Sequence, residues 1–299
     1  MELRQLEYFV AVAEEANFTR AAERVHISQS GVSAQIRALE NELGAPLFDR
    51  SGRAARLTAA GSAALRHAWD ALDAASALRE AVDDVNGLVR GRLAVGMITG
   101  CEVTPLFEAL AAFHRDHPGI DIALQEDNSD RLIDHVRVGL VDLALVGLAA
   151  RPPEGLDAQV IISEGLVAAV PAGHPLAEQA RVELTELTAY PMVCLPVGTG
   201  IRSVLDQACA AVGLRADIAL QATAPGAVAD LAARGLGVAV LSASMAAAYP
   251  GLRAVPIDGV DIPALLALVW RPGASPALRE LLPHCQRTFG LNKTEDSAA

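Results

Sequence analysis

The sequence predicts an α+β protein with several domains: a helical N-terminal domain with a small hairpin, a long linker helix, and a C-terminal α/β domain of two lobes. Three observations lead to this prediction. Apolar residues recur at helical spacing in short segments before residue 44, one unbroken helical pattern follows over residues 59–89, and strands alternate with helices from residue 92 onward. The 299 residues are enough for two or three folding units.

The composition is that of a globular protein, with 52% apolar and 20% charged residues. Residues 1–18 carry acids where a secretory signal needs an unbroken apolar core, namely Glu2, Glu7, Glu14 and Glu15. Apolar runs such as residues 262–270 reach about half of the roughly 20 residues that span a bilayer. We therefore expect a cytoplasmic protein with no export signal and no membrane span.

Four cysteines are widely spaced and lack a CxxC pair: Cys101, Cys194, Cys209 and Cys285. This spacing predicts neither a disulfide framework nor a zinc site. We expect buried, reduced thiols.

The formal net charge is -12, but it is unevenly distributed. Residues 1–58 hold eight acids and seven arginines, a net charge of -1, which leaves -11 for the rest of the chain. Within residues 18–58 six arginines outnumber four acids, and Arg50, Arg53 and Arg56 recur at every third position. This segment can therefore face phosphate despite the acidic chain.

Three helices are expected in the N-terminal domain. The first ends near Glu15, and its apolar face consists of Leu3, Leu6, Phe9, Val10 and Ala13. The second is capped by Asn17 or Thr19 and ends at a turn at His26 and Ile27. The third begins after Ser28 as its N-cap and ends before Gly44. Its core face is predicted to consist of Val32, Ile36, Leu39 and Leu43.

The opposite face of the third helix would present Gln29, Ser30, Ser33, Ala34 and Arg37. Glutamine can bond an adenine edge, serine several bases, and arginine a guanine or a phosphate, so this face suits a DNA major groove. A helix, a tight turn and a second helix make the helix-turn-helix arrangement. An ordinary pair of core helices has the same spacing and remains an alternative.

Residues 46–58 predict a small hairpin, or wing, with its turn at Ser51 and Gly52 and with three arginines, Arg50, Arg53 and Arg56. Residues 59–89 then predict one long helix. Its apolar positions alternate between spacings of three and four, which is typical of a coiled-coil seam and favours a dimer. The seam consists of Leu65, Ala68, Leu72, Ala75, Leu78, Val82, Val85 and Val89. The alternative is a helix that packs on its own domain.

Residues 18–61, FTRAAERVHISQSGVSAQIRALENELGAPLFDRSGRAARLTAAG, resemble the DNA-binding domain of LysR-type transcriptional regulators. The resemblance implies a winged helix-turn-helix, a linker helix that dimerises, and an effector domain similar to periplasmic binding proteins. The family often has alanine or threonine at the position of Gly31 and a larger polar or basic residue at Ala34, so the operator sequence does not follow. The expected DNA contacts are Thr19, Arg20, Ser28, Gln29, Ser30, Ser33, Ala34, Arg37, Arg50, Arg53 and Arg56.

The rest of the chain predicts two α/β lobes, each with a parallel sheet covered by helices. The first round has strands at 92–97, 120–126 and 142–147 with helices at 102–118 and 129–139. The second has strands at 166–171, 191–195, 216–221 and 237–242 with helices at 201–212 and 226–234. A strand at 264–270 and a helix at 276–289 return to the first lobe, as the resemblance implies. The expected boundaries are 1–58, 59–89 and 90–290, with lobe 1 at about 90–161 and 265–290, lobe 2 at about 162–264, and a flexible tail at 291–299.

Ligands of α/β sheets bind beyond the carboxyl ends of the strands, so we expect an effector cleft between the lobes. Its predicted lining consists of Ile98, Thr99, Gly100, Cys101, Asn128, Ser129, Val146, Gly147, Thr199, Gly200, Ile201 and Arg202. Free N–H groups at 199–201 and the cation of Arg202 would suit a small carboxylate. The segment at 198–202 is also compatible with a simple tight connection between a strand and a helix.

No P-loop, HExxH or GxSxG motif and no metal-ligand spacing of histidines occurs, so we expect neither an enzyme nor a cofactor. Two alternatives stay open. One is a solute-binding protein or an enzyme with an accessory helical domain. The other is a redox-responsive regulator using Cys194 and Cys209, although Gly200 stands nine residues before Cys209, where peroxide-sensing relatives have the reactive cysteine. The predicted function is an effector-controlled transcriptional regulator that forms a homodimer or homotetramer on DNA.

Overall fold

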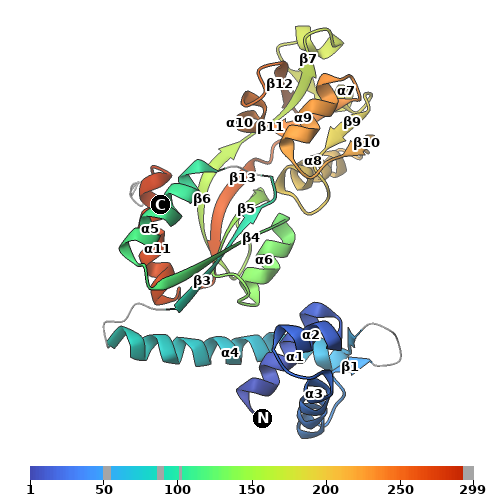
Figure 1. Cartoon of the computed structure of the whole chain (residues 1–299). Helices are drawn as coiled ribbons and strands as arrows, with labels where there is room; N and C mark the ends of the chain where they lie inside the picture. Colours follow the sequence, from blue (N-terminus) through green and yellow to red (C-terminus); the bar gives the residue numbers. More distant parts are fainter. Residues whose placement is uncertain (50–54, 86–90, 101–102, 292–299) are drawn as a thin grey trace, which may run out of the picture. The chain divides into compact units, whose positions relative to one another are not determined.

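The computed structural model describes residues 1–49, 55–85, 91–100 and 103–291 (Figure 1). The chain divides into two compact units, Met1–Leu88 and Val89–Ala299, and each is described by itself. Arg50 and Arg53, Cys101, Val89 and all but the first residue of the predicted tail lie outside the described residues. No helix among the described residues is long and apolar enough to cross a membrane.

The N-terminal unit begins with three helices, α1 (Leu3–Glu15), α2 (Phe18–Arg24) and α3 (Gln29–Leu43). Asn17, and not Thr19, caps α2, and the Ser28 hydroxyl caps α3 by accepting a bond from the Gly31 N–H at 3.1 Å. Gly44 ends α3 in the left-handed conformation, as predicted. A short antiparallel hairpin of β1 (Phe48–Asp49) and β2 (Arg56–Leu57) follows.

The core of this unit combines all three helices with the start of the hairpin. Phe9, Ile36 and Leu39 are fully buried, and Leu47 and Phe48 join them from the hairpin. Leu43 was predicted in the core but is 47% exposed, which corrects the prediction. It is the last residue of α3, where Gly44 turns the chain away and Leu47 and Phe48 fill the core instead.

The linker helix α4 (Ala59–Val85) forms as predicted within the described residues, but the first half of its seam is already used. Ala68 is buried, and Leu65 and Leu72 pack beside it against the core of the same unit. Leu78, the second seam residue after Leu72, is 69% exposed. Packing on its own domain is therefore the correct interpretation for Leu65, Ala68 and Leu72, whereas Leu78, further along α4, is exposed.

The C-terminal unit contains two sheets. The first has the order β4-β3-β5-β13-β6 and brings the late strand β13 beside strands of the first round. Helices α5 (Thr104–Asp116) and α11 (Pro276–Thr288) share a core on one face, and α6 (Ser129–Arg137) packs on the other (Figure 1). The strands are β3 (Gly91–Ile98), β4 (Ile120–Asp127), β5 (Leu143–Ala149), β6 (Asp157–Glu164) and β13 (Ala264–Trp270).

The second sheet has the order β10-β9-β11-β7-β12-β8. Its strands are β7 (Leu166–Pro171), β8 (Val182–Glu183), β9 (Met192–Cys194), β10 (Ile218–Gln221), β11 (Val238–Ser242) and β12 (Leu252–Asp258). Its helices are the 3-10 helix η1 (Pro175–Glu178), α7 (Leu184–Leu187), α8 (Gly200–Ala211), α9 (Pro225–Ala233) and α10 (Ala243–Ala247).

The prediction of parallel sheets is wrong in part, because both sheets are mixed. Strand β13 pairs antiparallel with β5 and β6, and β7 pairs antiparallel with β11 and β12. The chain passes from β6 directly into β7 and from β12 directly into β13, with no helix between the two strands of either pair. A parallel neighbour usually needs a crossover helix, so β7 and β13 can pair antiparallel.

Candidate functional site

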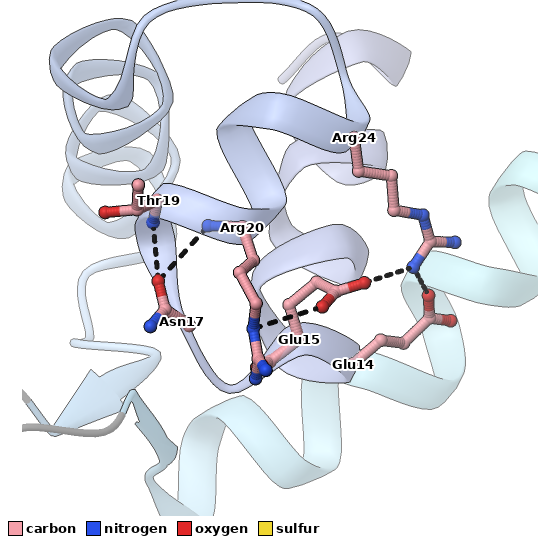
Figure 2. Close-up of polar contacts among 6 residues, drawn as sticks. All are labelled: Glu14, Glu15, Asn17, Thr19, Arg20 and Arg24. Atoms are coloured by element: carbon pink, nitrogen blue, oxygen red, sulfur yellow. Dashed lines mark hydrogen bonds and ion pairs between the residues drawn. The ribbon is translucent and has the colours of Figure 1, made fainter.

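The helix-turn-helix is held by local hydrogen bonds around α2. The Asn17 side-chain oxygen accepts bonds from the N–H groups of Thr19 at 2.8 Å and Arg20 at 3.2 Å (Figure 2). His26 turns the chain with a φ of 55°, and the Ile27 N–H donates to the Ala22 carbonyl at 3.1 Å. These bonds fix the angle at which α3 leaves α2.

Two arginines of α2 bind acids at the end of α1 (Figure 2). The Arg20 Nε lies 3.5 Å from a carboxylate oxygen of Glu15, and Arg24 bonds the Glu14 carboxylate and lies 3.7 Å from that of Glu15. Arg20 was predicted to contact DNA. The structure gives it a role in joining α1 to α2, although most of its side chain stays exposed.

The outward face of α3 is polar and has little charge. Gln29, Ser30, Ala34 and Arg37 are exposed there, and Ser33 is half-buried. Ser28, also a predicted contact, uses its hydroxyl as the helix cap and lies 3.1 Å from the Ser30 hydroxyl. The face therefore offers hydrogen-bonding groups with Arg37 as its cation, which is the chemistry that base edges in a major groove require.

The hairpin is fixed beside α3 by a carboxylate. Glu40 accepts bonds from the N–H groups of Leu47 at 2.8 Å and Phe48 at 3.2 Å. At its other end the Thr58 hydroxyl donates to the Pro46 carbonyl at 2.7 Å. Arg56 is exposed on β2, and Arg50 and Arg53 lie outside the described residues.

A cleft of about 1070 Å³ lies between the two lobes of the C-terminal unit. Nine of the predicted lining residues do line it: Ile98, Thr99, Gly100, Asn128, Ser129, Gly147, Thr199, Gly200 and Ile201. They come from the ends of β3, β4 and β5 in the first lobe and from the start of α8 in the second. The rule that ligand sites follow the carboxyl ends of strands located them.

Close contacts between the lobes form one wall of this cleft. Gly200 lies directly against the backbone of Gly147, where a Cβ atom would stand 2.4 Å from the Gly147 carbonyl carbon. The Gly147 N–H donates to the buried Ser129 hydroxyl at 3.0 Å, and the Asp130 N–H donates to the Gly198 carbonyl at 3.3 Å. The start of α8 is thus packed tightly on β5 and α6.

Two predicted lining residues lie elsewhere. Val146 is fully buried between β5 and α6, because the alternation of a strand directs its side chain away from the side that Gly147 faces. Arg202 does not line the cleft either. Its Nε donates to both carboxylate oxygens of Asp206, at 2.9 and 3.0 Å, and its side chain is only 13% exposed. Asp206 lies one turn further along α8, so this ion pair holds the Arg202 guanidinium away from the N-terminal end of the helix, which lines the cleft.

Sequence reasoning missed the part of the lining that comes from β6, α9 and α10. The most informative residue is Glu164, whose carboxylate accepts bonds from the Ser244 N–H at 2.9 Å and from the Ser244 hydroxyl. Ser242, Tyr249 and Thr223 also line the cleft. Strand β6 has no clear alternation of apolar and polar residues, so nothing in the sequence indicated that Glu164 ends a strand at this site.

Two family models cover almost the whole chain. Residues 3–62 match the model described as bacterial regulatory helix-turn-helix protein, lysR family, and residues 86–290 match the LysR substrate binding domain. The chain belongs to the LysR family of bacterial transcriptional regulators. The N-terminal unit thus carries the helix-turn-helix of a LysR-type regulator, and the C-terminal unit carries its effector-binding domain.

Individual relatives match this chain over almost its whole length. The chain is 35% identical over 293 residues to the uncharacterized HTH-type transcriptional regulator YnfL of Escherichia coli, covering 95% of this chain and 97% of that one. It resembles a full-length OxyR variant from Pseudomonas aeruginosa with a TM-score of 0.70, 25% identity and 99% coverage of both chains. It also resembles full-length CbnR in complex with its target DNA, with a TM-score of 0.57, 26% identity, and coverage of 96% and 100%.

The three described cysteines do not favour the redox alternative within the LysR family. Cys194, Cys209 and Cys285 are free and buried. Burial raises the pKa of Cys194 to about 12 and also raises the pKa of Cys209. A thiol reacts with peroxide as its thiolate, so thiols with raised pKa values are poor sensors. Within the described residues, no group of three or more histidine, cysteine or acidic side chains could hold a metal ion.

Proposed function

We propose that α3 reads operator DNA in the major groove and that a small molecule bound in the interlobe cleft alters this binding. The observation that carries the proposal is the exposed face of α3, which offers Gln29, Ser30 and Arg37 without an acid among them. Ser33 and Ala34 would complete the contact with bases. Thr19, Arg20 and the hairpin arginines Arg50, Arg53 and Arg56 would contact the phosphate backbone.

A dimer would present two such helices to two half-sites. The exposed Leu78 supports pairing through the part of α4 beyond its own core, and the assembly is a homodimer or a homotetramer of the chain. Regulation requires the effector to bind one arrangement of the assembly more tightly than another. Such a protein acts where the chromosome lies, in the cytoplasm, and it binds its effector without transforming it.

The test is to select operator sequences from random duplex DNA with the full-length protein and to measure their affinities by gel shift. We expect a preferred sequence with two related half-sites, bound about 10³-fold or more tightly than random duplex. Equal affinity for selected and random duplexes would contradict the proposal.

A further inference from the structure

The cleft between the lobes has an unusual charge balance. Its described lining contains no lysine, arginine or histidine, but it contains three acids, Glu126, Asp127 and Glu164. The adjoining positions outside the described residues are Cys101 and Glu102, neither of which is a cation. A ligand carboxylate would therefore meet no cationic side chain here, since Arg202 is bound to Asp206 outside the lining.

Helix N-termini could bind an anion in place of a cation, but two of those at this cleft, of α6 and α10, are already capped. Asn128 caps α6 by accepting from the Arg131 N–H at 3.0 Å, and Ser242 accepts from the Met245 N–H at the start of α10. Glu164 takes the next free N–H of α10, that of Ser244. Neither α8 nor α9 has a side-chain cap, but α8 begins tightly packed against the Gly147 backbone, and α9 begins with a proline, which has no N–H.

The three acids differ in what already neutralises them. Asp127 accepts the Asn128 N–H at 2.8 Å and lies 3.3 Å from the Arg131 guanidinium. Glu126 is exposed near the edge of the first sheet. Glu164 is half-buried, and both of its described hydrogen bonds come from the uncharged groups of Ser244. Among the described residues, no cationic side chain forms an ion pair with the Glu164 carboxylate.

The rest of the lining is mostly apolar. Side chains that would enclose a hydrophobic body come from both lobes and include Phe107, Ile162, Leu195, Met245, Leu265 and Phe289. A carboxylate at the wall of such a cleft would attract a cation strongly, because charges interact more strongly when water is partly excluded. An ammonium could donate to the lone pairs that Ser244 leaves free.

We propose that the effector of this regulator is a small organic cation, an ammonium group on an apolar body, whose N–H groups donate to Glu164. This inference rests on the proposed role of the cleft as the effector site, and it replaces the small carboxylate expected from the sequence.

The test compares ligands of matched shape by isothermal titration of the full-length protein. Phenethylamine, phenylacetate and phenethyl alcohol share one apolar body, and hexylamine, hexanoate and hexanol share another. We expect at least one amine to bind more tightly than its carboxylate and its alcohol. The inference is overturned if the carboxylates bind more tightly than the amines, if the alcohols match the amines, or if neither amine binds at millimolar concentration.

A variant pair locates the site. Glu164→Gln can keep both bonds with Ser244 but loses the charge, so amine binding should weaken by about tenfold or more. Glu178→Gln removes an exposed acid of η1 outside the cleft and should leave amine binding unchanged. Equal amine affinity in wild type and Glu164→Gln would also overturn the inference.

Specific DNA binding, measured on the same preparations, separates this failure from a failure of the proposed function. Binding of carboxylates by a protein that still prefers its operator would overturn only the amine inference. Absence of an operator preference in the wild-type protein would overturn the proposed function itself, whichever ligands the protein binds.

Discussion

Replacing Gly200 by alanine should force the two lobes of the C-terminal unit apart. The added Cβ would stand 2.4 Å from the Gly147 carbonyl carbon and 2.5 Å from the Leu148 nitrogen, and both of these atoms belong to the backbone of β5. Ordinary contact begins near 3.4 Å, so α8 must move by about 1 Å relative to the sheet. Overpacking of this kind costs about 1–3 kcal/mol of the free energy of unfolding.

For a unit of this size, a loss of about 2 kcal/mol lowers the melting temperature by about 4–8 °C. Differential scanning calorimetry of the full-length protein measures it, with Gly165→Ala as the matched control because nothing lies within 4 Å of a Cβ there. Operator affinity without ligand should persist in both variants, since Gly200 lies outside the DNA-binding unit. Equal melting temperatures for Gly200→Ala and Gly165→Ala would refute the reasoning about the packed wall of the cleft.

Three further substitutions test separate parts of the structure. Ala16 ends α1 with a φ of 47°, so Ala16→Gly should raise the free energy of unfolding of the N-terminal unit by about 0.5–1 kcal/mol in urea titrations, and a loss would contradict this. Burial raises the pKa of Asp142 above 3.8, so its stabilising effect is present at acid pH and is lost as pH rises through the raised pKa. Asp142→Asn, which can still accept the Ala94 N–H, should therefore raise the melting temperature at neutral pH and less at acid pH; the reverse order would count against it. Leu78→Asp should give monomers in light scattering, whereas an intact dimer would place the interface elsewhere.

Local signals predicted the N-terminal unit well because they act within a few residues. Asn17, Ser28 and Gly44 end or begin helices through their own side chains or backbone, so their roles can be seen in the sequence. The predicted burial of Leu43 was wrong because it depends on which other residues fill the core, and the hairpin residues Leu47 and Phe48 occupy that space.

The cleft was predicted in part for a similar reason. Strand ends and helix starts located the residues near Thr99, Asn128 and Gly147. Glu164 was missed because it ends β6, a strand without clear alternation that pairs at the edge of the first sheet with the distant β13. The ion pair of Arg202 does follow from the sequence, because Asp206 stands four residues later on the same helix, within reach of the guanidinium.

The central claim is that the exposed face of α3 reads bases, and a comparison of two glutamines on this helix tests it most directly. In gel shifts on a selected operator and on random duplex, Gln29→Ala should cost about 1–3 kcal/mol of binding free energy at the operator and little on random duplex. Gln35→Ala is the control, because Gln35 accepts a bond from the Gln5 side chain at 3.3 Å and lies away from the proposed reading face. Retained operator affinity in Gln29→Ala, or an equal loss on both duplexes, would contradict the claim.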